Sequence, residues 1–295
     1  MSRIPNVWPK SSLASELPPC ETKLSVSSNL VSALPKIAGY HIHAVAGEGN
    51  EAAVFVGHGA GDGWSEPSRP RGTPLAFKAI EPRRVQTVAM SMVLLRGIVS
   101  AHLAMPRALA RDEHGGWWMV SVYVHGAPLG PGPVEPGRAC EEALGVARAL
   151  AAIHDRGTHH GDVSAGNVIS TEDGGVRLID FGSLGQRGTG TPGFLAPEVL
   201  AGGGGAAADW FSLGALTCLR LTGQVPWRRP EQVARYSVED ARARIESMER
   251  SGSAAWPPGL AALLGDLLDP RPEVRRGIGA KACARLQRIL EGGAE

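Results

Sequence analysis

Three polar side chains in one stretch of the chain are of the types that handle magnesium nucleotides. Asp162 is followed five positions later by Asn167, and Asp180 opens a glycine-containing turn after an apolar run. Carboxylate and amide oxygens are ligands that Mg²⁺ accepts in proteins, and a further carboxylate can orient an attacking hydroxyl. Two oxygen ligands and one carboxylate base from adjacent loops therefore predict phosphoryl transfer from a magnesium nucleotide.

The motifs around these side chains resemble those of the eukaryotic-type (Hanks-type) protein kinase family. His160-Gly161-Asp162 is similar to the catalytic loop, in a His-Gly-Asp form that looks bacterial. Asp180-Phe181-Gly182 and Ala196-Pro197-Glu198 resemble two further motifs, in the family's order. Asp209-Trp210-Phe211-Ser212-Leu213-Gly214 looks like the start of the family's central helix, so the resemblance covers roughly residues 39–290.

This resemblance implies an α+β fold with two lobes, a small β-rich lobe and a larger helical one. We expect the small lobe and the hinge in residues 39–124 and the helical lobe in residues 125–292. Residues 1–38 carry prolines and serines with little periodicity, which predicts a poorly structured or loosely docked extension.

The expected small lobe has two features suited to a nucleotide. Residues 39–56 alternate as strands do, and Gly47-Glu48-Gly49-Asn50 lies between the two strands. Glycines let backbone amides approach phosphates, whereas a dinucleotide-binding motif would open a helix rather than lead into a strand. The short apolar strand 75–80 carries Lys78, and a cation in an apolar strand needs a partner.

The resemblance implies a set of site residues. The catalytic residues would be Lys78, Asp162 and Asn167, with Asp162 orienting the acceptor hydroxyl. Asn167 and Asp180 would hold Mg²⁺. Lys78 would meet the α- and β-phosphates, and Ser121 would be the small residue behind adenine. The whole ATP-binding set would be Gly47, Glu48, Gly49, Asn50, Val54, Ala76, Lys78, Ser121, Val122, Tyr123, Val124, Asn167 and Asp180.

Other residues are assigned structural roles by the same resemblance. Asp209 would cap the backbone of the catalytic loop, and Thr191 would brace Asp162. Glu198 would pair with Arg275 or Arg276.

Three positions depart from the family pattern. A kinase has a Glu on the helix that follows its lysine, but residues 85–106 contain no Asp or Glu, which leaves Gln86 or nothing to pair with Lys78. Ser164 stands where serine/threonine kinases usually have a lysine, and Gly161 where many kinases have an arginine. Without that arginine, phosphorylation need not switch the enzyme on.

These observations favour an ATP- and Mg²⁺-dependent serine/threonine protein kinase of low activity that acts on a protein substrate. The first alternative is a pseudokinase, a nucleotide-binding interaction module, which the missing helix Glu and Ser164 favour. The second is a small-molecule or peptide-modifying phosphotransferase, because His-Gly-Asp also occurs in such enzymes.

Composition restricts the other function classes. The chain has 295 residues, 43% of them hydrophobic, and a formal net charge of +1, so nothing indicates nucleic acid as a partner. The dispersed Cys20, Cys140, Cys218 and Cys283 predict buried or inert thiols in a reducing compartment. The apolar stretch 85–110 is interrupted by charged residues, which favours a core helix over a membrane span. We expect a cytoplasmic protein of undetermined oligomeric state.

Overall fold

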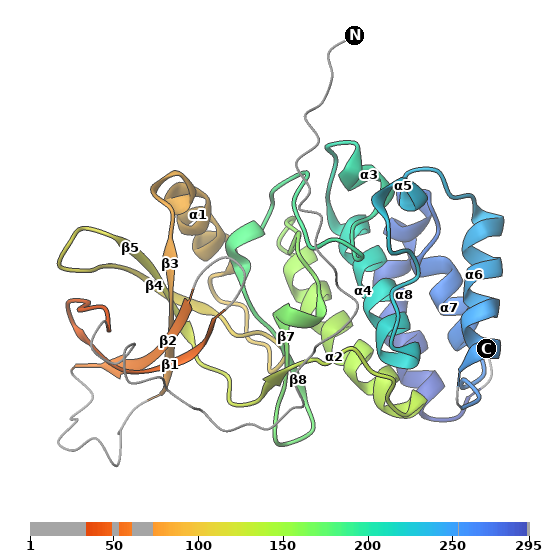
Figure 1. The fold of residues 1–295 in the computed structure, drawn as a ribbon, viewed down its shortest axis with the longest axis horizontal. Helices are drawn as coiled ribbons and strands as arrows, with labels where there is room; N and C mark the ends of the chain where they lie inside the picture. The colour runs from red at the N-terminus through yellow and green to blue at the C-terminus, as the bar shows by residue number, and fades with distance from the viewer. Residues whose placement is uncertain (1–33, 49–52, 61–72, 253, 294–295) are drawn as a thin grey trace, which may run out of the picture. The chain divides into compact units, whose positions relative to one another are not determined.

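A five-stranded antiparallel sheet in the order β1-β2-β3-β5-β4 forms the first half of the fold (Figure 1). The computed structural model describes residues 34–48, 53–60, 73–252 and 254–293. The strands are Tyr40–Glu48 (β1), Ala53–Gly59 (β2), Leu75–Ile80 (β3), Pro106–Arg111 (β4) and Trp117–Val122 (β5). The predicted strand at residues 75–80 is confirmed.

The two faces of this sheet differ because side chains alternate along each strand. Phe55, Phe77, Trp118 and Val120 point to one face, where they form a small buried core. Phe77 is fully buried, and Phe55 meets Trp118 edge-on at 5.6 Å between ring centroids. The other face carries Lys78 and Ser121 together with the buried apolar side chains of Val56 and Met119.

The segment that leads into β1 is part of the same core. Ile37 is 3% exposed and forms an isolated bridge with Asp112, at the end of β4. Leu34 packs against the same core. The compact unit begins at Leu34, before residue 39, where we expected the small lobe to start.

The apolar stretch 85–110 does not form one core helix as predicted. Helix α1 spans Val85–Leu95, and the chain then turns and enters β4. Gly97 has a φ of +79°, a left-handed conformation that ends a helix, and Pro106 lacks the amide that a continuing helix would need. Met90 and Val93 on α1 are 58% and 67% exposed, so only part of the helix is core.

The second half of the fold is helical, with a small sheet at its start (Figure 1). The sheet has the order β6-β7-β8 and consists of Ala127–Pro128, Val168–Ser170 and Val176–Leu178. The helices are Pro136–His154 (α2), Pro197–Leu200 (α3), Ala206–Thr222 (α4), Pro230–Val233 (α5), Val238–Ser251 (α6), Leu260–Leu267 (α7) and Pro272–Leu290 (α8). Within the described residues, 3₁₀ turns span Pro82–Arg84 (η2), Ala165–Asn167 (η3) and Phe181–Ser183 (η4).

Helices α2, α4 and α8 pack on one another around the largest core. Helix α2 begins at Pro136, because proline suits the first helical position and the Glu135 carboxylate accepts a hydrogen bond from the Gly137 amide at 2.9 Å. None of the described helices has the length and apolarity that crossing a membrane requires.

The described cysteines are free, and burial lowers their acidity. It raises the pKa of Cys140 to about 11 and that of Cys218 to about 12. Because the thiolate is the reactive form, we expect iodoacetamide at pH 7.5 to alkylate both thiols at least about a hundredfold more slowly in the native protein than in the denatured protein. Peptide-level mass spectrometry of native and denatured protein checks this. Native-state labelling at the denatured rate would contradict the burial. Cys20 lies outside the described residues.

Candidate active site

Lys78 lies on the face of the first sheet opposite the aromatic core. Across the strands, Lys78 pairs with Val54 and Ala76 pairs with Ser121. Residues paired in this way share a face of an antiparallel sheet. The four therefore form one surface, and all belong to the predicted nucleotide-binding set.

The predicted glycine-rich turn joins β1 to β2. Gly47 and Glu48 at the end of β1 pair with Val54 and Ala53 at the start of β2. The predicted strand–turn–strand is thus confirmed for its two strands. Gly49 and Asn50 of the predicted set lie outside the described residues.

The segment after β5 connects the two halves of the fold. Val122 donates its amide to the Met105 carbonyl at 3.2 Å, and Tyr123 donates to the Pro74 carbonyl at 2.9 Å. Val124 is 8% exposed and its side chain packs in a small core that includes Ile169 of β7. In the described part of the chain, the Val124 amide enters no backbone hydrogen bond, so it can donate to a ligand.

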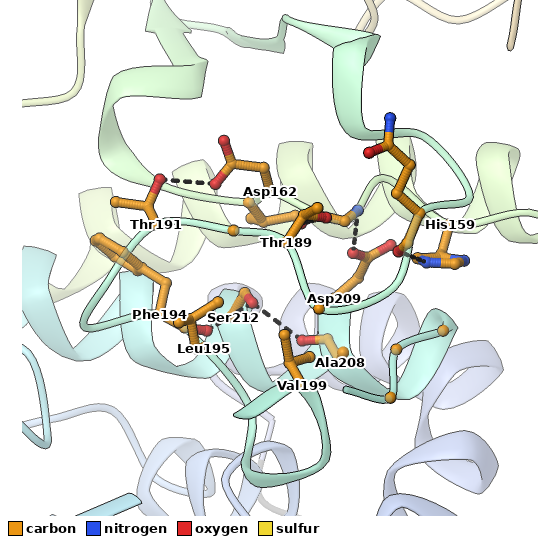
Figure 2. A pocket seen from close by; sticks show the side chains of 18 residues that line it. His159, Asp162, Thr189, Thr191, Phe194, Leu195, Val199, Ala208, Asp209 and Ser212 are labelled. Carbon is orange, nitrogen blue, oxygen red and sulfur yellow. Dashed lines mark hydrogen bonds between the residues drawn. The ribbon is translucent and has the colours of Figure 1, made fainter. Parts of the chain in front are cut away.

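The carboxylate of Asp162 is held by two neighbours. Thr191 Oγ1 donates to Oδ1 at 2.7 Å (Figure 2), and Asn167 Nδ2 donates to Oδ2 at 2.9 Å. Asn167 Nδ2 also lies 2.9 Å from the Asp162 carbonyl oxygen. The prediction that Thr191 braces Asp162 is confirmed. Each carboxylate oxygen accepts about two hydrogen bonds and here accepts one from a side chain, so Asp162 keeps capacity for a further proton donor on each oxygen.

The carboxylate of Asp209, on α4, accepts hydrogen bonds from the backbone next to Asp162. Its Oδ2 accepts from the His160 amide at 2.7 Å and its Oδ1 from the Gly161 amide at 2.9 Å. The predicted cap is confirmed. His154, at the end of α2, donates from Nε2 to the same carboxylate at 2.8 Å, a contact that the sequence analysis missed. Burial disfavours the charged form of Asp209, but these hydrogen bonds and the neighbouring histidines outweigh it and lower its pKa.

His160 joins the loop of Asp162 to the strand end that leads to Asp180. Its Nε2 donates to the Ile179 carbonyl at 3.0 Å, and its Nδ1 accepts from the Asp162 amide at 3.3 Å. The ring also meets Phe181 edge-on at 5.6 Å between centroids.

Lys78 and Asp180 meet across the two halves of the fold. Lys78 Nζ lies 2.6 Å from Asp180 Oδ2, although 102 positions separate them in sequence. Asp180 has a φ of +63°, and its Oδ1 accepts from the Gly182 amide at 3.2 Å. Burial disfavours the charged carboxylate, but the charge and hydrogen bond of Lys78 outweigh this and lower the pKa of Asp180.

Asn167 and Asp180 supply neighbouring oxygen donors. The Ile179 amide donates to the Asn167 carbonyl at 2.9 Å, which brings the residue before Asp180 against Asn167. The Asn167 Nδ2 group is used by Asp162, which leaves its amide oxygen as an acceptor. One carboxylate and one amide oxygen from adjacent loops fit Mg²⁺, which usually completes its shell with phosphates and water.

Helix α1 contributes no carboxylate to this site. Its residues, Val-Gln-Thr-Val-Ala-Met-Ser-Met-Val-Leu-Leu, include no acid, and Gln86 is exposed. Lys78 is paired with Asp180 instead. The charge of Lys78 is therefore balanced by a predicted metal ligand and not by α1.

The Ala-Pro-Glu segment is anchored by a buried cation. Arg275 of α8 is fully buried, and its guanidinium contacts Glu198 Oε1. Arg275 Nε also donates to the Ala207 carbonyl at 2.9 Å. Of the two predicted partners for Glu198, Arg275 is the correct one.

The second half of the fold matches a known protein family. The model of the protein kinase domain matches residues 131–285 of the 295. The chain belongs to the protein kinase family.

Curated relatives agree with this kinase assignment. Over 133 residues the chain is 32% identical to CBL-interacting protein kinase 8 of Oryza sativa subsp. japonica, covering 41% of this chain and 28% of that protein. Over 138 residues it is 33% identical to a Caenorhabditis elegans protein whose name places it with tyrosine-protein kinases, covering 43% and 41%. The chain spans well under two thirds of the length of either relative.

A solved structure supports the two-lobed kinase fold. The crystal structure of Rad53 1–466 in complex with AMP-PNP matches with a TM-score of 0.64 and 23% sequence identity, covering 83% of this chain and 64% of that one. The likeness extends beyond the residues matched by the family model, so the predicted α+β kinase fold is confirmed.

The structure explains two departures of this kinase domain from the family pattern. Gly161 has a φ of +81°, and a Cβ there would lie 2.7 Å from the Ser183 carbonyl oxygen. The segment that carries Ser183 thus fills the space that an arginine side chain at position 161 would need. Ser164 is 4% exposed, so its side chain is held inside the catalytic loop.

The segment between Gly182 and Ala196 is held against the catalytic loop by hydrogen bonds that need no phosphorylated residue (Figure 2). The Gly185 amide donates to the His159 carbonyl at 2.8 Å, and His159 Nε2 donates to the Gln186 carbonyl at 2.8 Å. The Gly188 amide donates to the Gly203 carbonyl at 2.8 Å. A small hollow that is partly open to solvent lies beside this segment, and Asp162 and Asp209 both line it.

Proposed function

We propose that the chain is an ATP- and Mg²⁺-dependent serine/threonine protein kinase that works in the cytoplasm on a protein substrate. The observation that carries the proposal is the 2.6 Å contact between Lys78 and Asp180, beside a catalytic loop that His160 links to the same turn. The combination of one cation, two carboxylates and an amide oxygen suits a charged triphosphate and its metal ion.

Each residue has a role that follows from its position. Asp162 orients the acceptor hydroxyl and takes its proton while the hydroxyl oxygen bonds to the γ-phosphorus. The bond from that phosphorus to the β,γ-bridging oxygen breaks, and its electrons stay on ADP. Asn167 and Asp180 would hold Mg²⁺, which when bound neutralises phosphate charge. Lys78 would turn from Asp180 toward the α- and β-phosphates, and the Val124 amide would donate to adenine.

The arrangement of the acceptor side supports a protein acceptor over a small molecule. The ion pair of Glu198 with Arg275 anchors the Ala-Pro-Glu segment, and Asp209 holds the catalytic loop on α4. Both features build the part of a kinase domain on which a peptide docks. A small-molecule or peptide-modifying phosphotransferase is the weaker candidate, and phosphoamino-acid analysis of labelled protein tests the choice of acceptor.

A pseudokinase is the second candidate, because α1 offers Lys78 no carboxylate and Ser164 offers the γ-phosphate no charge. A transfer assay with labelled ATP and Mg²⁺ or Mn²⁺, run with a nucleotide-binding assay, separates the two. Incorporation of label into protein supports the kinase. Nucleotide binding with no incorporation would overturn the proposal in favour of the pseudokinase.

Substituting Lys78 tests its assigned role. Lys78→Met should reduce transfer by at least roughly 100-fold and weaken nucleotide binding, because one preorganised charge can contribute that much to a phosphoryl-transfer site. Lys36→Met is the matched control, since Lys36 is 78% exposed and pairs only loosely with Glu113 at 3.5 Å. Transfer measured under saturating ATP gives the comparison, and equal rates in the two variants would show that Lys78 is misassigned.

A further inference from the structure

The carbonyl oxygen of Gly182 is a junction between two side chains. Arg84 Nη2 donates to it at 2.9 Å and Gln186 Nε2 at 2.8 Å. A Cβ on Gly182 would lie 3.0 Å from Arg84 Nη2 and 3.2 Å from Asp180 Oδ1. The guanidinium is therefore packed directly against the turn that carries Asp180.

Arg84 brings this contact from the start of α1. It is the residue before Val85, at the end of the 3₁₀ turn η2, and α1 packs against η4. Helix α1 has no acid that could pair with Lys78. Its polar link to the site is instead the hydrogen bond from Arg84, at the start of the helix, to the Gly182 carbonyl.

The turn that Arg84 holds is of a kind that needs support. Asp180 is the non-glycine residue with a left-handed conformation in the described part of the chain, at a φ of +63°. Its Oδ1 accepts from the amide of the same Gly182 whose carbonyl faces Arg84. A left-handed non-glycine residue persists where its surroundings over-determine it, so a donor fixed on Gly182 also fixes the direction of the Asp180 carboxylate.

The same carbonyl connects α1 to the catalytic loop. Gln186 donates to Gly182 through its side chain and accepts a hydrogen bond from His159 Nε2 on its own carbonyl, at 2.8 Å. His159 lies in the loop that carries Asp162. Gln186 therefore links the Gly182 carbonyl, which Arg84 holds, to the catalytic loop.

We propose that Arg84 is a positioning residue for the metal-binding turn, setting the direction of Asp180 by holding the Gly182 carbonyl. This proposal rests on the proposed kinase function as regards its effect on catalysis. The effect on the turn itself does not depend on activity, so the two can fail separately.

The first test uses hydrogen–deuterium exchange on the ligand-free chain. Arg84→Met should speed exchange in the peptide covering residues 180–186 by roughly tenfold, because a charged donor has been lost from a partly buried acceptor. Arg84→Lys, which keeps a cationic donor, should fall between Arg84→Met and the wild type. Arg83→Met is the matched control, since the Arg83 side chain is 82% exposed and pairs with Glu81.

The second test measures the Mg²⁺ concentration that gives half-maximal transfer. Arg84→Met should raise it roughly tenfold while leaving nucleotide binding without metal within about twofold, since Arg84 acts through a metal ligand. Unchanged exchange in Arg84→Met, or an equal change in Arg83→Met, would overturn the inference. If the wild type transfers no phosphate, the proposed kinase function is wrong. The exchange comparison would still decide whether Arg84 positions the turn.

Discussion

Replacing Asp162 with Asn is expected to reduce phosphoryl transfer by roughly 10²- to 10⁴-fold, the usual contribution of a positioned general base. Asn cannot take the proton of the acceptor hydroxyl. Its amide group would also face either the Thr191 hydroxyl or the Asn167 amide, both of which now donate to the carboxylate. The measurement is the rate of labelled phosphate transfer at saturating ATP and Mg²⁺.

The control for this variant separates chemistry from binding. Asp162 is paired with Thr191 and Asn167 rather than with Lys78, so nucleotide affinity should change little. Asp155→Asn, at an exposed aspartate just after α2, should transfer at the wild-type rate. Full activity in Asp162→Asn would mean that another group accepts the proton.

Replacing Asp209 with Ala is expected to lower the free energy of unfolding by about 3–5 kcal/mol, the usual loss when one partner of a buried charged network is removed. Asp209 is 1% exposed, and the substitution leaves two backbone amides and the His154 side chain without their acceptor. Chemical denaturation followed by circular dichroism gives the value. Glu246→Ala is the control, since the side chains of its surface pair, Arg250 and Glu246, are 72% and 65% exposed and the loss should be about 1 kcal/mol or less.

The pH dependence of stability gives a second readout for Asp209. Because the pKa of this carboxyl is lower in the folded protein than the ordinary value, its contribution is complete above about pH 4 and is lost as pH falls through the lower folded pKa. Asp209→Asn should therefore lose less stability than the wild type on acidification in this range. An unchanged acid response would mean that Asp209 carries no charge in the folded protein.

The local sequence was sufficient to predict much of the kinase site. The strand 75–80 with Lys78, the loop of Asp162 and Asn167, and the turn of Asp180 each depend on residues within a few positions of one another. Periodicity and turn chemistry are readable over that range. The caps by Asp209 and Thr191 and the partner of Glu198 could be predicted because they accompany motifs with a known arrangement.

The tertiary structure decided the contacts that no local pattern carries. The sequence places Lys78 in an apolar strand, but its pairing with Asp180 depends on how two distant elements pack. Arg84 and Gly182 are 98 positions apart, and a cation against a backbone carbonyl leaves no signature in residue types. Backbone preferences act between neighbours along the chain, whereas side-chain partners are selected by the packing of whole elements. The sequence therefore identified the groups to which we assign phosphoryl transfer, and only the folded chain determined which of them touch.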